Sequence, residues 1–190
     1  MRGPDRRKTS RRSRVAGGSA AARELLLAAV DGKKSVTLQS RNRSPEVVFA
    51  RVGERVKYEG WRSDERIEMA PIEIDFADFD HLRGEKKVLE AFDLGFAILH
   101  ELCHAVLELR DPSEGVKEAG DCESYINRIR RELGMPERRH YVADVYQRTS
   151  SATRNKIIAQ LAFTQPGPSA KTKMRYLTWD VREVGNIRLR

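Results

Sequence analysis

The stretch "FAILHELCHAVLEL", residues 96–109, places two histidines four positions apart within an apolar segment. Positions i and i+4 of an α-helix share a face, so His100 and His104 can present ring nitrogens to one cation. Glu101 lies about 100° around the helix from His100. A carboxylate there can reach a metal-bound water without ligating the metal, as a general base does. The spacing therefore predicts a zinc-binding catalytic helix, and a core helix with satisfied histidines is the alternative.

The helical spacing around this motif begins well upstream of the histidines. It runs over residues 85–109, and Asp111-Pro112 is expected to end the helix. Residues 110–120 are typical of a loop. A second helix is then predicted over residues 122–133, with Asp121 as its N-cap.

Shorter elements are predicted before the long helix. Residues 19–31 favour a helix that stops at a glycine, and β-branched runs then favour strands. The expected strands lie within residues 34–40, 45–53, 54–61 and 66–80. Pro71 limits the last of them to a sheet edge or a strand start. This order predicts an α+β fold, with a small, mostly antiparallel sheet followed by the motif helix and the second helix.

The C-terminal part reads differently. A third helix is expected over residues 151–163, and "PGPSAKTK" forms a linker-like break. A terminal strand pair is then predicted from "KMRYLTWDV" and "GNIRLR". The resulting division is a basic disordered arm over residues 1–18, one domain over 19–165 and a basic tail over 166–190.

The net charge of +8 belongs to the two ends of the chain. Residues 1–14 hold seven Arg and Lys, and residues 170–190 hold six, which leaves 23 basic and 25 acidic residues between them. The ends are expected to be solvated tails, or alternatively to contact nucleic acid or an acidic partner protein. No apolar run is long enough to cross a bilayer, so no membrane contact is expected. With only Cys103 and Cys122, a cytoplasmic location is favoured, with a secreted effector as the alternative.

Two segments together resemble a known family. "ILHELCHAVLEL" is similar to the signature helix of the zincin metallopeptidases, and "NRIRRELGMPERRHY", residues 127–141, resembles a run in effector-type and toxin-associated members. The resemblance covers about residues 95–141. It implies a glutamate-type zincin fold, bound Zn²⁺ and a polypeptide substrate. It also implies an edge strand above the catalytic helix, for which "PIEIDF", residues 71–76, is the counterpart.

The same resemblance suggests a third zinc ligand downstream of the histidines. Glu123 lies nineteen residues beyond His104 and is the preferred ligand, with Glu118 and Asp121 as rivals. Asn127, one turn after Glu123, is expected to hold a ligand histidine in orientation.

His140 and Tyr141 follow the second helix and are candidates for stabilising an oxyanion. The function predicted from the sequence is a zinc-dependent metallopeptidase with Glu101 as general base, of toxin or effector type. The alternative is a non-catalytic binding protein whose basic termini engage nucleic acid or an acidic partner.

Overall fold

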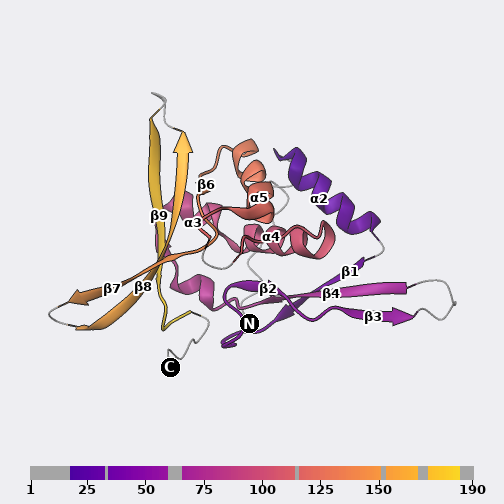
Figure 1. The fold of residues 1–190 in the computed structure, drawn as a ribbon, viewed down its shortest axis with the longest axis horizontal. Helices are drawn as coiled ribbons and strands as arrows, with labels where there is room; N and C mark the ends of the chain where they lie inside the picture. The colour runs from indigo at the N-terminus through magenta and orange to yellow at the C-terminus, as the bar shows by residue number, and fades with distance from the viewer. Residues whose placement is uncertain are drawn as a thin grey trace, which may run out of the picture.

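The chain forms a mixed α+β fold with two sheets (Figure 1). The computed structural model describes residues 18–32, 34–59, 66–113, 116–150, 153–166 and 171–184. Its elements are α2 (Ala20–Asp31), β1 (Lys34–Ser40), β2 (Ala50–Val52), β3 (Val56–Glu59), β4 (Arg66–Ile74), the 3₁₀ helix η1 (Asp78–His81), β5 (Arg83–Gly84), α3 (Lys86–Ala91), α4 (Leu94–Val106), α5 (Gly120–Glu132), β6 (Glu137–Arg138), β7 (Asp144–Ser150), β8 (Thr153–Pro166) and β9 (Thr172–Asp180). Helices α2 and α4 lie over the first sheet, α5 packs against these two helices, and the second sheet stands beside them (Figure 1). Among the described residues, no helix combines the length and apolarity needed to cross a membrane.

The first sheet has β4 at its centre. Strand β1 pairs with β4 in parallel, and β2 and β3 both pair with its other side in antiparallel register. The prediction that Pro71 marks an edge is therefore wrong. Pro71 lies where the neighbouring chain is interrupted between β2 and β3, and its carbonyl accepts from Gly53 N–H at 2.8 Å. A missing N–H costs little at such a gap. Strand β2 is an outer strand of this sheet.

The second sheet has the order β5-β9-β8-β6, with β7 also paired to β8. The helix expected over residues 151–163 is wrong, because residues 153–163 belong to the long strand β8; residues 151–152 lie outside the described residues. Ala159, Leu161 and Phe163 are buried at a spacing of two, as in a strand with one covered face. The strand expected at "KMRYLTWDV" is confirmed as β9, which pairs with β8. Its expected partner, residues 185–190, lies outside the described residues, as does the basic arm over residues 1–17.

The helix expected over residues 85–109 is two helices. Helix α3 ends at Ala91, and Asp93 starts α4 by accepting a hydrogen bond from Phe96 N–H at 3.1 Å. An Asp side chain that caps a new helix end competes with a continuous helix, which explains the break. Helices α2 and α5 form close to their predicted places.

The N-terminus of α5 has a different cap from the predicted one. Ala119 occupies the N-cap position, and Asp121 lies exposed in the first turn. The N–H groups of Asp121 and Cys122 donate to Arg110 O at 3.1 and 3.3 Å. The loop after α4 therefore satisfies the start of α5, which is one way these two helices are held together.

Helix α4 packs into the first of two apolar clusters. Phe96, Leu99 and Leu102 join α2, α5 and β4 in the first cluster. The second cluster lies between the second sheet and α3, around Phe163, Leu177 and Val88. The apolar face of α4 thus fixes the helix, and the motif residues occupy its remaining surface.

Candidate metal centre

The two motif histidines point their outer ring nitrogens at each other. His100 Nε2 and His104 Nε2 are 3.2 Å apart, and the His100 ring is almost fully buried. Since each residue sits one turn from the other on α4, this approach follows from the helical repeat alone. Two imidazole nitrogens that converge in this way leave room for one shared proton or one shared cation.

A tight reversal after α4 brings an acidic side chain to the same point. Glu108 has a φ of +57°, a left-handed conformation that is uncommon for a residue with a Cβ. The chain turns back, and the Leu109 carbonyl then lies 2.7 Å from His104 Nδ1. A carbonyl at Nδ1 keeps the proton on that nitrogen, so Nε2 of His104 carries a free lone pair.

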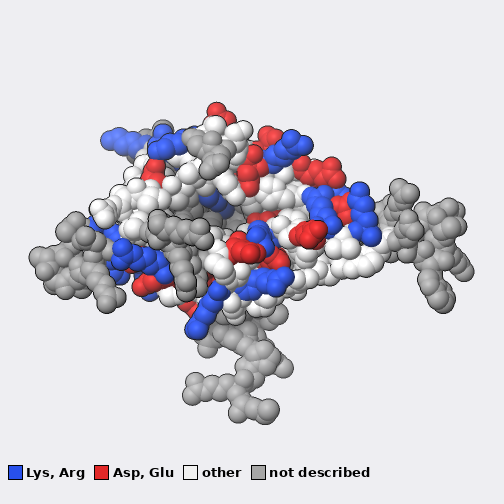
Figure 2. Space-filling view, turned by 60° about the horizontal axis from the view of Figure 1, so that its bottom comes forward, with Lys and Arg blue, Asp and Glu red and all other residues white. Residues whose placement is uncertain are grey.

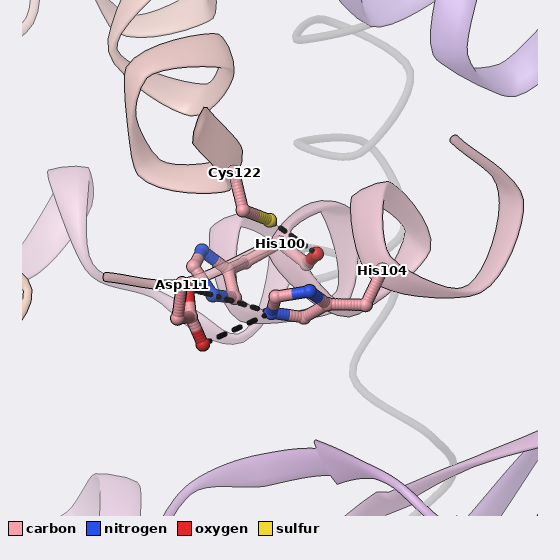
Figure 3. A group of neighbouring side chains, drawn as sticks. All are labelled: His100, His104, Asp111 and Cys122. Atoms are coloured by element: carbon pink, nitrogen blue, oxygen red, sulfur yellow. Dashed lines mark hydrogen bonds and ion pairs between the residues drawn. The ribbon is translucent and has the colours of Figure 1, made fainter. Parts of the chain in front are cut away.

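Asp111 completes this group, two residues further along (Figure 3). Its Oδ1 lies 3.3 Å from His100 Nε2, and its Oδ2 lies 3.2 Å from His104 Nε2. Asp111 Oδ1 is buried and has no hydrogen-bond partner among the described residues. Two imidazoles and one carboxylate facing a common point are a usual donor set for a divalent metal.

Glu123 lies at the other side of His100. Its Oε2 is 3.4 Å from His100 Nδ1, and its side chain is fully buried. It also forms ion pairs with Arg130 and Arg138. The structure thus places Glu123 behind His100, opposite the nitrogen that faces Asp111.

The buried Arg130 makes hydrogen bonds to two side chains and one backbone carbonyl. It donates to Glu123, to Asn127 Oδ1 at 2.8 Å and to Ala91 O at 2.9 Å. Its guanidinium also lies over the Phe96 ring. This arginine ties α5 to the end of α3 and fixes the Glu123 carboxylate.

Asn127 organises the segment after α5. Its amide accepts from Arg138 N–H at 2.8 Å and donates to Arg138 O at 2.7 Å. Arg138 in turn donates to the carbonyls of His140 and Tyr141. Asn127 therefore positions the chain that carries Arg138 and Tyr141, while the side chain beside His100 Nδ1 is that of Glu123.

Tyr141 contacts the candidate metal ligands, whereas the His140 side chain contacts the neighbouring loop. The Tyr141 ring stacks on His100 with centroids 5.8 Å apart, and its hydroxyl is hydrogen-bonded to Asp111. His140 Nδ1 lies 2.9 Å from Lys117 O in the neighbouring loop. Of the rival ligands, Glu118 and Asp121 are both exposed.

Cys122 is close to the histidines, but its thiol is occupied. The Cys122 Sγ donates to His100 O at 3.1 Å (Figure 3). Cys103 and Cys122 are both free and buried. A thiol that faces a helix carbonyl behaves as a packed apolar group.

Charges in the centre shift several pKa values. Burial opposes a charge on His100, but the carboxylates of Asp111 and Glu123 outweigh it and raise the pKa of the ring to about 9. Burial likewise opposes ionisation of Asp111, yet the two histidines hold its pKa well below the usual range. Without a metal, a proton on the histidines therefore balances the Asp111 carboxylate, at the place where a divalent cation would do the same.

Glu101 follows His100 on α4 and is not one of the grouped donor residues. Burial raises the pKa of its carboxyl, and it accepts a hydrogen bond from the backbone of Val52 in β2. The charges of His100 and His104 are close enough to lower that pKa in part. A buried carboxylate with a raised pKa beside a cation site matches what a proton acceptor and donor needs.

A pocket opens from the metal centre toward the second sheet. Its volume is about 330 Å³, and its walls include His100 and Glu101 at one end and Leu161 and Trp179 at the other. The face drawn in Figure 2 is hollowed near its middle, and both acidic and basic side chains border the hollow. The pocket therefore adjoins the candidate site at His100 and Glu101, whereas His104 and Asp111 are not among its walls.

Comparison with known protein families, with curated proteins and with solved structures finds no match for this chain. The site must therefore be judged by its own geometry. The sequence pattern predicts Asp111 only as part of a helix stop and not as a ligand. The available signal was its distance from His104: an acidic residue seven positions on, directly after a helix end, can fold back onto the helix.

Proposed function

We propose that this protein is a zinc-dependent peptide hydrolase that uses His100, His104 and Asp111 as metal ligands. The observation that supports it most is the convergence of His100 Nε2, His104 Nε2 and the Asp111 carboxylate within 3.2–3.3 Å. Imidazole and carboxylate donors suit zinc, and three protein ligands leave a position for substrate. Glu101, on the same helix, occupies the general-base position.

The donor set fits a cation for a further reason. Asp111 Oδ1 is buried without a hydrogen bond among the described residues, and its near neighbour is His100 Nε2 at 3.3 Å, so a proton on the histidine or a cation is needed to balance it. A zinc ion there supplies a Lewis acid for a peptide carbonyl and lowers the pKa of water. Glu123 is proposed to hold His100 from behind rather than to bind the metal, since carboxylate–histidine pairs orient metal ligands.

The residues of the chain then have separate roles. Glu101 takes the proton of the attacking water and passes it to the leaving amine, for which a raised pKa is suitable. Tyr141 holds the Asp111 carboxylate through its hydroxyl. The role of Tyr141 at an oxyanion, the zincin arrangement and an effector-type target remain predictions, as do contacts made by the basic termini.

The test compares metal content and hydrolysis in matched variants of the full chain. Zinc is measured by native mass spectrometry, and hydrolysis is followed on a mixture of unstructured peptides. Glu101→Gln is expected to bind zinc like the wild type and to lose about 10²–10⁴-fold in rate. His100→Ala is expected to lose both.

Glu118→Gln serves as the control, because it makes the same change at an exposed glutamate near the centre. It should leave metal content and rate unchanged. Hydrolysis that persists at the wild-type rate in Glu101→Gln would disprove the assignment of the base. A wild-type protein that takes up no zinc would disprove the proposal as a whole.

A further inference from the structure

The Asp111 side chain is carried by a short segment, residues 107–112, which we call the ligand arm. Its first half folds back on α4, where Leu107 N–H and Leu109 N–H both donate to Cys103 O, at 3.1 and 3.3 Å. Carbonyl groups in the last turn of a helix lack a partner within the helix, so the ligand arm supplies the donors. These two bonds fix where the ligand arm leaves α4.

The second half of the ligand arm is held by the first turn of α5. The N–H groups of residues 121–122 donate to Arg110 O at 3.1 and 3.3 Å, and such first-turn groups have no acceptor within their own helix. Because Arg110 directly precedes Asp111, these two bonds set where the Asp111 backbone lies. Glu123 belongs to the same turn of α5 and lies behind His100. One turn of α5 therefore places both carboxylates that flank His100.

Gly120, the first residue of α5, lets the helix and the ligand arm approach closely. Its φ is +73°, and a Cβ at this position would lie 2.5 Å from Pro112 Cδ, 2.8 Å from Pro112 N and 3.2 Å from Asp111 C. Carbon atoms that are not bonded pack at about 3.5–4.0 Å, so the shortest of these contacts is too close by about 1 Å. Two of the three atoms belong to the backbone and the third to a proline ring, so none can rotate away. Any side chain at Gly120 must therefore push the ligand arm, with Asp111, away from α5.

From these contacts we infer that Gly120 is a positioning residue of the metal centre: because it has no Cβ, α5 can hold the Asp111 carboxylate against the two histidine nitrogens. A displacement of about 1 Å is large for a metal site, whose donor atoms must be held to within about 0.5 Å. The fold thus sets the place of the carboxylate before a metal binds. This inference rests on the ligands named in the proposed function and not on hydrolysis, so metal binding alone can test it.

The experiment measures zinc affinity in the full chain by competition with a chromophoric chelator, for Gly120→Ala and a matched control. Gly134→Ala is that control, because Gly134 also has a positive φ, +65°, and no described atom lies within 4 Å of the place of its Cβ. Both substitutions carry the cost of a left-handed alanine, but only the one at Gly120 meets the ligand arm. Zinc affinity is expected to fall by at least about tenfold in Gly120→Ala and to equal that of the wild type in Gly134→Ala.

A second pair of variants covers the case in which Gly120→Ala does not fold. Asparagine adopts the left-handed conformation more readily than most residues with a Cβ, so Gly120→Asn is easier for the backbone yet keeps the contact with Pro112. Circular dichroism shows whether each variant is folded. We expect Gly120→Asn to fold and to lose zinc affinity by at least about tenfold, and Gly134→Asn to bind zinc as the wild type does.

A double-mutant cycle shows whether Gly120 acts through Asp111. If it does, Gly120→Ala should not weaken zinc binding further in a chain that already carries Asp111→Asn. The visible absorption of bound Co²⁺ depends on the number and kind of its ligands, so Gly120→Ala should change it and Gly134→Ala should not. A merely structural role would give additive losses of zinc affinity and leave the cobalt spectrum of Gly120→Ala unchanged, and these results would overturn the inference.

The outcomes separate this inference from the proposed hydrolysis. Equal zinc affinities in folded Gly120→Asn and the wild type would overturn the positioning role and leave the hydrolase standing. Weakened zinc binding in the Gly120 variants, beside a wild type that binds zinc but cleaves no peptide, would support the positioning role and overturn the hydrolase. A wild type that takes up no zinc would overturn both.

Discussion

His100 has a carboxylate at each of its two ring nitrogens, and the two environments differ. Glu123, at Nδ1, is fully buried and paired with two arginines. Asp111, at Nε2, is partly exposed, and its partners are the two histidines and the Tyr141 hydroxyl. The charge of Glu123 is therefore compensated by the fold itself. That of Asp111 is compensated only by a proton on the histidines or by a cation.

Under the proposed function, this difference gives Glu123 a structural role on one side of His100 and Asp111 a metal-binding role on the other. A carboxylate already neutralised by two arginines is a poor donor to a dication, but it orients the ring. A carboxylate that faces two imidazole nitrogens has its attraction for a cation still available. Three substitutions separate the two roles, and a fourth, at Glu73, compares Glu123 with a glutamate whose arginine partners are exposed.

The largest effect is expected from Glu123→Gln. It leaves Arg130 and Arg138 without their shared counter-charge in a buried place, so the free energy of unfolding should fall by about 3–5 kcal/mol. Chemical denaturation of the metal-free protein measures this loss. Glu137→Gln is the control, because Glu137 pairs with the exposed Arg131 and should change stability by about 1 kcal/mol or less. An unchanged stability in Glu123→Gln would contradict the structural role.

Asp111→Asn should act on metal affinity instead. Loss of a ligand is expected to weaken zinc binding by more than the roughly 10–100-fold typical of residues behind the ligands. Competition with a chromophoric chelator measures the affinity, and Asp121→Asn, an exposed aspartate on α5, is the control. Stability without metal should change less than in Glu123→Gln. If Glu123→Gln lost zinc and Asp111→Asn retained it, the two carboxylates would have exchanged roles.

Tyr141→Phe tests how Asp111 is positioned without removing its carboxylate. It removes only the hydroxyl that holds the carboxylate, while the ring can still stack on His100. Zinc affinity is expected to fall by about tenfold, at the lower end for groups that orient a ligand. Tyr146→Phe, an exposed tyrosine in β7, is the control. Equal zinc affinities for Tyr141→Phe and the wild type would show that the hydroxyl does not position Asp111.

The residues of this comparison were not equally predictable from the sequence. His100, Glu101 and His104 lie on one helix, where a local repeat determines which side chains meet. The polar stripe of Glu123, Asn127 and Arg130 on α5 also follows helical spacing, although a sequence does not show which member faces a histidine. The position of Asp111 depends on a left-handed turn at Glu108. Residues other than glycine rarely adopt this conformation, so the sequence gives no signal for it.

The second sheet shows the same limit at larger scale. Residues 151–163 contain enough helix-favouring side chains to suggest a helix, yet from Thr153 onward the chain forms β8, which pairs with β7 and β9. Such pairing depends on partners elsewhere in the chain, which override local propensity. A local sequence pattern therefore could not predict that Leu161 and Trp179 form one wall of the pocket.

The smallest loss of stability is expected from a substitution at Glu73, which, like Glu123, pairs with two arginines but lies near the surface. Glu73 in β4 is held between Arg41 and Arg51, both about half exposed. Glu73→Gln should therefore cost only about 1 kcal/mol at pH 7, because solvent screens these arginines. The hydrogen bond from Arg51 outweighs burial and lowers the pKa of Glu73 in the folded protein. The Glu73 ion pairs therefore stabilise the fold fully above the pKa of an unfolded glutamate, about 4.3, and this stabilisation is lost as the pH falls through the pKa of Glu73 in the folded protein. Denaturation of wild type and Glu73→Gln at pH 7 and pH 3 should show the difference shrinking toward acid; a loss at pH 7 as large as that of Glu123→Gln would mean that burial does not separate the two sites.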